Sequence, residues 1–120
     1  MTTRIDLDGP DVDLTAAQVL LYQDEPFTGE AVEYRKDGSL WTLETYVDGY
    51  RDGPTKQWYP DGSLEEEGQT KSGVAVGEWR EWHPNGQPRR RAVYSEDVLG
   101  QRILSEQTWD EAGNLTSQRP

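Results

Sequence analysis

The 120-residue sequence contains no cysteine and few of the aliphatic residues that fill a compact core. Without cysteine, disulfide bonds, zinc–thiolate sites and cysteine nucleophiles are excluded. Only 32% of the residues are apolar, so we expect no thick two-layer core. No stretch has convincing helical periodicity, and the longest apolar stretch, around Val19 to Tyr22, is far too short to span a bilayer.

Basic residues are also in deficit. The chain has 12 Lys and Arg against 23 Asp and Glu, which gives a net charge of -11. A surface this acidic repels nucleic-acid backbones and anionic lipid, and it attracts a basic protein. The sequence therefore predicts no direct contact with nucleic acid or with a membrane. Because the N-terminus has no basic segment followed by an apolar run, we expect a cytoplasmic protein.

What the chain does contain is a repeat of about 24 residues. Glycine and aromatic residues recur at matching positions of successive copies, and each set of matching positions is called a column. The unit is clearest in the stretch YVDGYRDGPTKQWYPDGSL, from Tyr46 to Leu64. Its regularity argues against the disorder that low hydrophobicity and high net charge would otherwise suggest. We expect an acidic N-terminal segment over residues 1–18 and a repeat array over residues 19–120. The approximate copies are 22–45, 46–69, 70–93 and 94–120, the last displaced by an insertion at Val98 to Arg102.

Each copy has the turn chemistry of a β-hairpin. In Pro60-Asp61-Gly62-Ser63, the proline presets φ for a type I turn and the glycine takes the left-handed position that follows. The strand leading out ends at Asp48-Gly49 or Ser72-Gly73, and the glycine pairs Gly49 with Gly53 and Gly73 with Gly77 are expected to link one hairpin to the next through three residues. The predicted fold class is all-β, a single-layer antiparallel sheet built from tandem hairpin repeats of about 24 residues.

Alternation along the strands predicts which side chains share a face. The matched columns are assigned to a packed face; they contain Trp58, Leu64 and Thr70 with Tyr34, Leu40, Tyr46 and with Trp82, Pro88, Tyr94. Columns that vary between copies are assigned to the solvent or binding side. They contain Arg35, Tyr59 and His83, then Trp41, Glu65 and Arg89, then Tyr50 and Val74.

The sequence contains none of the usual catalytic or metal-binding patterns of residues, so we expect no enzyme, no cofactor and no metal site. His83 is the only histidine, and no nucleophile with a base is visible. The consecutive carboxylates Glu65, Glu66 and Glu67 alternate between faces and would not converge. Asp6-x-Asp8-Gly9 starts like a calcium loop, but Ala17 stands where the closing glutamate belongs. A short strand interrupted by the Gly9-Pro10 turn is the preferred interpretation of this acidic segment.

One basic run, Arg89-Arg90-Arg91, falls at the repeat positions that match Glu65-Glu66-Glu67. The two runs would lie two strands apart, roughly 10 Å, so their direct pairing is not assured. Glu78 and Glu81, on the intervening strand, are the predicted partners of the arginines.

These residues resemble a known family. The pattern Tyr46-x-x-Gly49-x-x-x-Gly53-x-x-x-x-Trp58-x-x-Asp61-Gly62-x-Leu64 resembles the MORN-repeat variant, and an acidic chain with three to four copies is similar to bacterial YwqK-type antitoxins. Departures are Thr70 for the column tyrosine, Pro88 for leucine and Asp97 for glycine. The resemblance implies an antitoxin or immunity protein that binds a secreted or polymorphic toxin, commonly a nuclease or deaminase.

Exposed aromatics beside acids have the composition of an interface for a basic protein. The predicted partner-binding residues are Trp41, Tyr50, Tyr59, Trp79, Glu65 and Glu67. The alternative function is a structural or scaffold interaction module that binds envelope proteins or associates with itself edge to edge, because an open sheet leaves unpaired strands.

Overall fold

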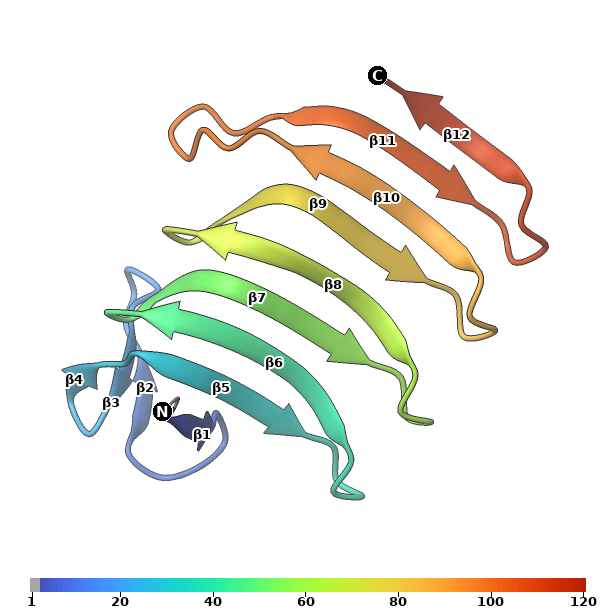
Figure 1. The fold of residues 1–120 in the computed structure, drawn as a ribbon. Helices are drawn as coiled ribbons and strands as arrows, with labels where there is room; N and C mark the ends of the chain where they lie inside the picture. The colour runs from blue at the N-terminus through green and yellow to red at the C-terminus, as the bar shows by residue number, and fades with distance from the viewer. Residues whose placement is uncertain (1–2) are drawn as a thin grey trace.

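Strands alternate with turns along residues 3–120, the part of the chain that the computed structural model describes. Residues 1 and 2 of the predicted acidic segment 1–18 lie outside the described residues. The described chain forms twelve β-strands in two sheets and no helix (Figure 1). Accordingly, residues 3–120 include no helix with the length and apolar character needed to cross a membrane.

A nine-stranded sheet makes up most of the molecule, in the order β1-β5-β6-β7-β8-β9-β10-β11-β12. All its neighbours are antiparallel except β1 and β5. The predicted all-β hairpin array is therefore confirmed, with one parallel strand added at its edge. The strands are β1 (Arg4–Asp6), β5 (Gly29–Tyr34), β6 (Leu40–Val47), β7 (Tyr50–Trp58), β8 (Leu64–Lys71), β9 (Val74–Trp82), β10 (Pro88–Tyr94), β11 (Ile103–Trp109) and β12 (Leu115–Arg119).

The turns at one end of the strands share a single design. Gly38, Gly62, Gly86 and Gly113 have φ values of 88°, 90°, 87° and 90°, the left-handed conformation predicted for the glycine after a type I turn. In each turn the Asp or Asn side chain accepts a hydrogen bond from a backbone N–H further along. At the other end, Asp48-Gly49 and Ser72-Gly73 have positive φ at both residues, as a two-residue type I′ turn requires. The expected three-residue links are wrong, because β7 and β9 begin directly after these turns and include Gly53 and Gly77.

The predicted packed face is wrong in its third column, Tyr46, Thr70 and Tyr94, because a β-bulge follows each long turn. Glu33 and Tyr34 are consecutive on β5, so they point to opposite faces. Their partners on β6 are Thr42 and Leu40, which must also point to opposite faces although they are two residues apart. Tyr46, in register with Thr42, therefore lies on the face opposite Leu40. The same shift recurs at Glu65 in β8 and at Arg89 in β10.

We name the two faces by their residues. The cap face carries Ala31, Tyr46, Glu66, Glu81 and Ala92, which the register of neighbouring strands places on one side. The opposite face carries the paired row of Tyr34 with Leu40, Trp58 with Leu64, Trp82 with Pro88 and Trp109 with Leu115. The tryptophan and tyrosine columns of the repeat thus serve different sides of the sheet.

The N-terminal cap, residues 3–28, folds onto the first strands of the array. Its small sheet has the order β2-β3-β4, from β2 (Val12–Leu14), β3 (Leu20–Tyr22) and β4 (Glu25–Pro26). The strand expected around Gly9-Pro10 is divided, because β1 joins the large sheet and β2 joins the small one. Backbone hydrogen bonds fix the cap to the type I′ turn, from Leu20 N–H to Gly49 O and from Gly49 N–H to Phe27 O, both 2.8 Å.

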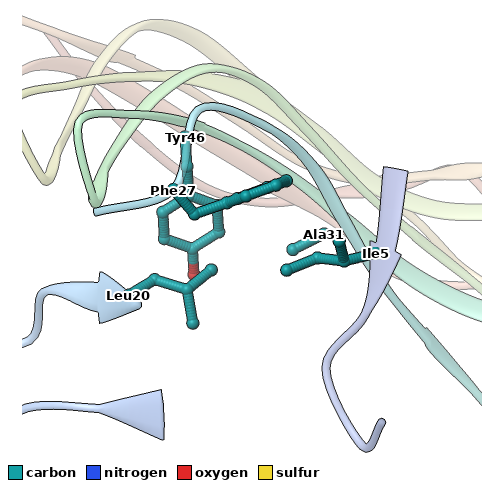
Figure 2. Close-up of a cluster of buried hydrophobic side chains, with 5 residues drawn as sticks. All are labelled: Ile5, Leu20, Phe27, Ala31 and Tyr46. Carbon is teal, nitrogen blue, oxygen red and sulfur yellow. The ribbon is translucent and has the colours of Figure 1, made fainter. Parts of the chain in front are cut away.

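The main hydrophobic cluster lies under this cap (Figure 2). Leu20 and Phe27 from the cap, with Ile5 from β1, pack against Ala31 and Tyr46 on the cap face. Among the described residues of β8 to β12, Val76 and Ala92 are the buried hydrophobic side chains. The array beyond the cap is therefore one layer thick, and each hairpin relies mainly on its immediate neighbours.

Candidate functional site

Three chemically different side chains connect successive hairpins on the cap face. Each reaches the main-chain carbonyl of the aromatic residue that ends the strand two strands further on. Because a carbonyl only accepts, the contacting nitrogen of the histidine must carry a proton. This connector column contains Arg35 Nη2 to Trp58 O at 2.6 Å, Tyr59 Oη to Trp82 O at 2.6 Å, and His83 Nε2 to Trp109 O at 2.8 Å.

The residues of the connector column differ between copies, but this variability does not mark a solvent or binding surface. The sequence assigned Arg35, Tyr59 and His83 to the solvent or binding side because they differ between copies. All three are half-buried and structurally engaged. A backbone carbonyl accepts from any donor that reaches it, so the position constrains the length and donor character of the side chain and not its identity.

We expect Tyr59→Phe to lower the free energy of unfolding by about 1 to 2 kcal/mol, because the Trp82 carbonyl loses its donor. Tyr59→His should recover part of this loss, since His83 fills the same position one hairpin later. Urea unfolding followed by tryptophan fluorescence would measure both variants. Unchanged stability in Tyr59→Phe would show that the connector contributes nothing.

A network of arginines and glutamates crosses the cap face from β8 to β12. Glu81 accepts from both Arg89 and Arg90 at 3.0 Å, and Arg90 continues to Glu106 at 2.6 Å. The ends are Glu65, 3.8 Å from Arg89, and Arg119, 3.0 Å from Glu106. The predicted pairing of Glu81 with this arginine run is confirmed. So is that of Glu78, which lies 2.7 Å from Arg91 on the opposite face.

Glu66 lies beside this network but forms no ion pair with a Lys or Arg side chain among the described residues. It faces Glu81 directly across the strands. Burial, and then the charge of Glu81, raise the pKa of the Glu66 carboxyl above its ordinary value. By contrast, the hydrogen bond from Arg90 holds the pKa of Glu106 below its ordinary value. The cap face therefore keeps negative charge that its arginines do not neutralise.

Two tryptophans of the predicted site have different roles on this face. Trp41, at the first bulge, is 38% exposed and stacks with the guanidinium of Arg35, 5.1 Å from the ring centroid. Trp79 is half-buried, donates from Nε1 to Gln69 O at 3.1 Å and meets Tyr94 edge to face at 6.3 Å. A Cβ on Gly68 would overlap the Trp79 ring, so the indole lies directly over that glycine. Trp41 is therefore partly exposed on the cap face, whereas Trp79 packs the sheet.

The structure brings together half of the predicted partner-binding residues. Trp41, Tyr59 and Glu65 lie near the long turns of the cap face, where the bulges direct Trp41 and Glu65. Trp79 is on the same face, deeper along the strands. Glu67 lies on the opposite face, paired in register with Lys56 and Arg80. Tyr50 is at the far end of β7, beside a type I′ turn and 47% exposed.

Sequence reasoning placed Arg35 and His83 on the solvent or binding side but missed their connecting role, and it missed Arg51, which donates to Glu44 at 3.0 Å on the cap face. The signal for the connector column was present as a donor side chain just before each of the first three long turns; the fourth has Asp110 at this position. Within residues 3–120, no group of three or more acidic or histidine side chains is arranged to hold a metal ion.

Two adjacent segments of the chain, residues 51–72 and 75–96, match the family described as the MORN repeat variant. The first match falls on the hairpin of β7 and β8, and the second on that of β9 and β10. Searches among curated proteins and among solved structures find no match. Repeats of this kind generally mediate protein interactions, so the two matched repeats indicate a protein-interaction module.

Proposed function

We propose that this protein is an antitoxin or immunity protein that binds a basic toxin, of nuclease or deaminase type, and occludes its active site or substrate groove. In this proposal it acts in the cytoplasm by stoichiometric binding and catalyses no reaction. The matched repeat supports protein binding, and the charge and the cap face support a basic partner.

The observation that carries the proposal is the distribution of unpaired acids. The N-terminal cap contains one arginine, Arg4, and six acids, and none of the six pairs with a basic side chain in residues 3–120. The cap projects from the same side of the sheet as Trp41, Tyr59 and Glu65. The six acids are Asp6, Asp8, Asp11, Asp13, Asp24 and Glu25.

This arrangement favours fast association followed by local anchoring. A net charge of -11 attracts a basic protein over a distance that salt shortens. On contact, exposed aromatic side chains supply most of the binding energy, and the surrounding acids set orientation. A broad single-layer sheet can cover a substrate groove without entering it.

The partner is identified by affinity purification of the tagged protein from lysate of its source cells, at low and moderate salt, with mass spectrometry. We expect one basic protein at near-equal stoichiometry, bound less tightly as salt rises. An activity assay of that protein must then show inhibition by this chain. Recovery of the chain alone, or of envelope proteins, would support the scaffold alternative.

With the partner in hand, Glu65→Gln and Glu67→Gln form a matched pair, because each removes one charge from β8 but on different faces. We expect Glu65→Gln to weaken binding about tenfold and Trp41→Ala about thirtyfold or more, whereas Glu67→Gln changes binding less than twofold. Isothermal titration calorimetry would measure all three. Loss in Glu67→Gln alone would place the interface on the opposite face.

A further inference from the structure

A cleft separates the N-terminal cap from the cap face of β5 to β7. Its volume is about 280 Å³, below the range of roughly 300–1,000 Å³ typical of pockets for drug-sized ligands. One wall is apolar and comes from the cap, and the other is polar and comes from the sheet. The apolar wall contains Leu7, Val12, Leu14 and Leu20, and the polar wall contains Glu33, Glu44, Tyr46 and Arg51.

The cleft opens at the side of the type I′ turns. A second hollow of about 240 Å³ shares Leu14, Tyr46 and Arg51 with it and extends to Tyr50. Leu14 is 55% exposed at this mouth. The two hollows are therefore adjacent, with Leu14 as an exposed apolar residue between them.

Some carboxylate oxygens of the polar wall accept no hydrogen bond from a side chain among the described residues. Tyr46 Oη and Arg51 Nε both donate to Oε2 of Glu44, at 2.7 and 3.0 Å, which leaves Oε1 without a side-chain donor among the described residues. Glu33 accepts from Thr42 through Oε1 at 2.9 Å and makes no ion pair within residues 3–120. Burial raises the pKa of Tyr46 to about 12, so its hydroxyl remains a donor. The polar wall therefore carries two carboxylates, Glu33 and Glu44, and one guanidinium, that of Arg51.

We propose that this cleft binds the side chain of one arginine on the protein partner. The proposal rests on the proposed function, since it names the anchor by which a basic partner engages the cap face. A guanidinium can bridge two carboxylates with its planar array of donors, which a lysine ammonium cannot match. The methylene stem of the arginine packs on Val12 and Leu14. The acidic cap beside the mouth supplies the charge complementarity.

The test uses Nα-acetyl-arginine N-methylamide as the probe and its uncharged citrulline counterpart as the reference. Both are titrated into the whole ¹⁵N-labelled protein and followed by two-dimensional NMR. The arginine probe should shift the backbone amides of Leu14, Tyr46 and Arg51, and the citrulline probe should not. Glu33→Gln should raise the dissociation constant about tenfold, because it removes a charge and keeps an acceptor for Thr42.

Glu25→Gln is the matched control, since it removes one exposed charge of the cap outside the cleft. Equal shifts with citrulline, or equal weakening by both glutamine variants, would overturn the cleft as an arginine site. A protein that inhibits a basic toxin but shows no shifts would also overturn it, and would leave the antitoxin proposal standing. Specific arginine shifts without any toxin partner would overturn the antitoxin proposal and support the cleft.

Discussion

Leu20→Ala is expected to lower the free energy of unfolding of the N-terminal cap by about 2 to 5 kcal/mol, as for other buried leucines replaced by alanine. Leu20 is 2% exposed and lies between the small sheet and Tyr46. The other buried cap residues of the cluster are Ile5 and Phe27, and Leu7, Val12 and Tyr22 pack against it while partly exposed.

The loss of stability in Leu20→Ala should be confined to one part of the chain. The cap packs on the first hairpin, and the backbones of β8 to β10 pair with their strand neighbours in the sheet. Hydrogen exchange should therefore show lost protection in residues 3–28 and in β5 and β6, with β8 to β10 nearly unchanged. Leu104→Ala, at an exposed position of β11, serves as the control. Uniform loss of protection from cap to β12 would contradict the nearest-neighbour description.

Trp79→Ala is expected to cost about 3 to 5 kcal/mol, the usual range for a large aromatic removed from a packed position. The indole covers Gly68, meets Tyr94 edge to face and donates a hydrogen bond to Gln69 O. Because β8 to β10 are covered by no second layer, this side chain provides much of their local packing. Chemical denaturation with global fitting would measure the change.

Gly68→Ala provides the complementary test. Its added methyl would overlap the Trp79 ring, so we expect a loss of about 1 to 3 kcal/mol from overpacking. In the Trp79→Ala background the same substitution should cost almost nothing, because the ring is gone. Additive costs in the double variant would show that Gly68 is required for a backbone reason and not for the indole.

The sequence was sufficient for the hairpins because turn geometry is local. An Asp or Asn before a glycine determines the long turns, and Asp48-Gly49 with Ser72-Gly73 determines the short ones. Strand order then follows, since each hairpin pairs with the next. The pairing of the arginine run with Glu78 and Glu81 was predictable for the same reason, as neighbouring strands bring these positions together.

The assignment of faces failed because strict alternation cannot anticipate a bulge. The extra residue after each long turn, such as Glu65, reverses the side to which Leu64 points relative to Glu66. The cap was also beyond sequence reasoning, because Leu20 and Phe27 lie outside the regular columns and their partners are distant in the chain. Gly68 belongs to no glycine column, so the repeat pattern does not indicate that the Trp79 ring lies over it.

The connector column has a consequence for how such a chain can change in length. Each hairpin donates to a main-chain carbonyl of the next, an acceptor that every residue type provides. The connector side chain of a duplicated hairpin would therefore still reach a main-chain carbonyl of the next hairpin. After deletion of a hairpin, its two neighbours could form the same hydrogen bond with each other. The three-residue insertion before β11 is already absorbed by a loop, while His83 still reaches Trp109. Gain and loss of whole hairpins could thus adjust the span of the sheet without redesign of its junctions.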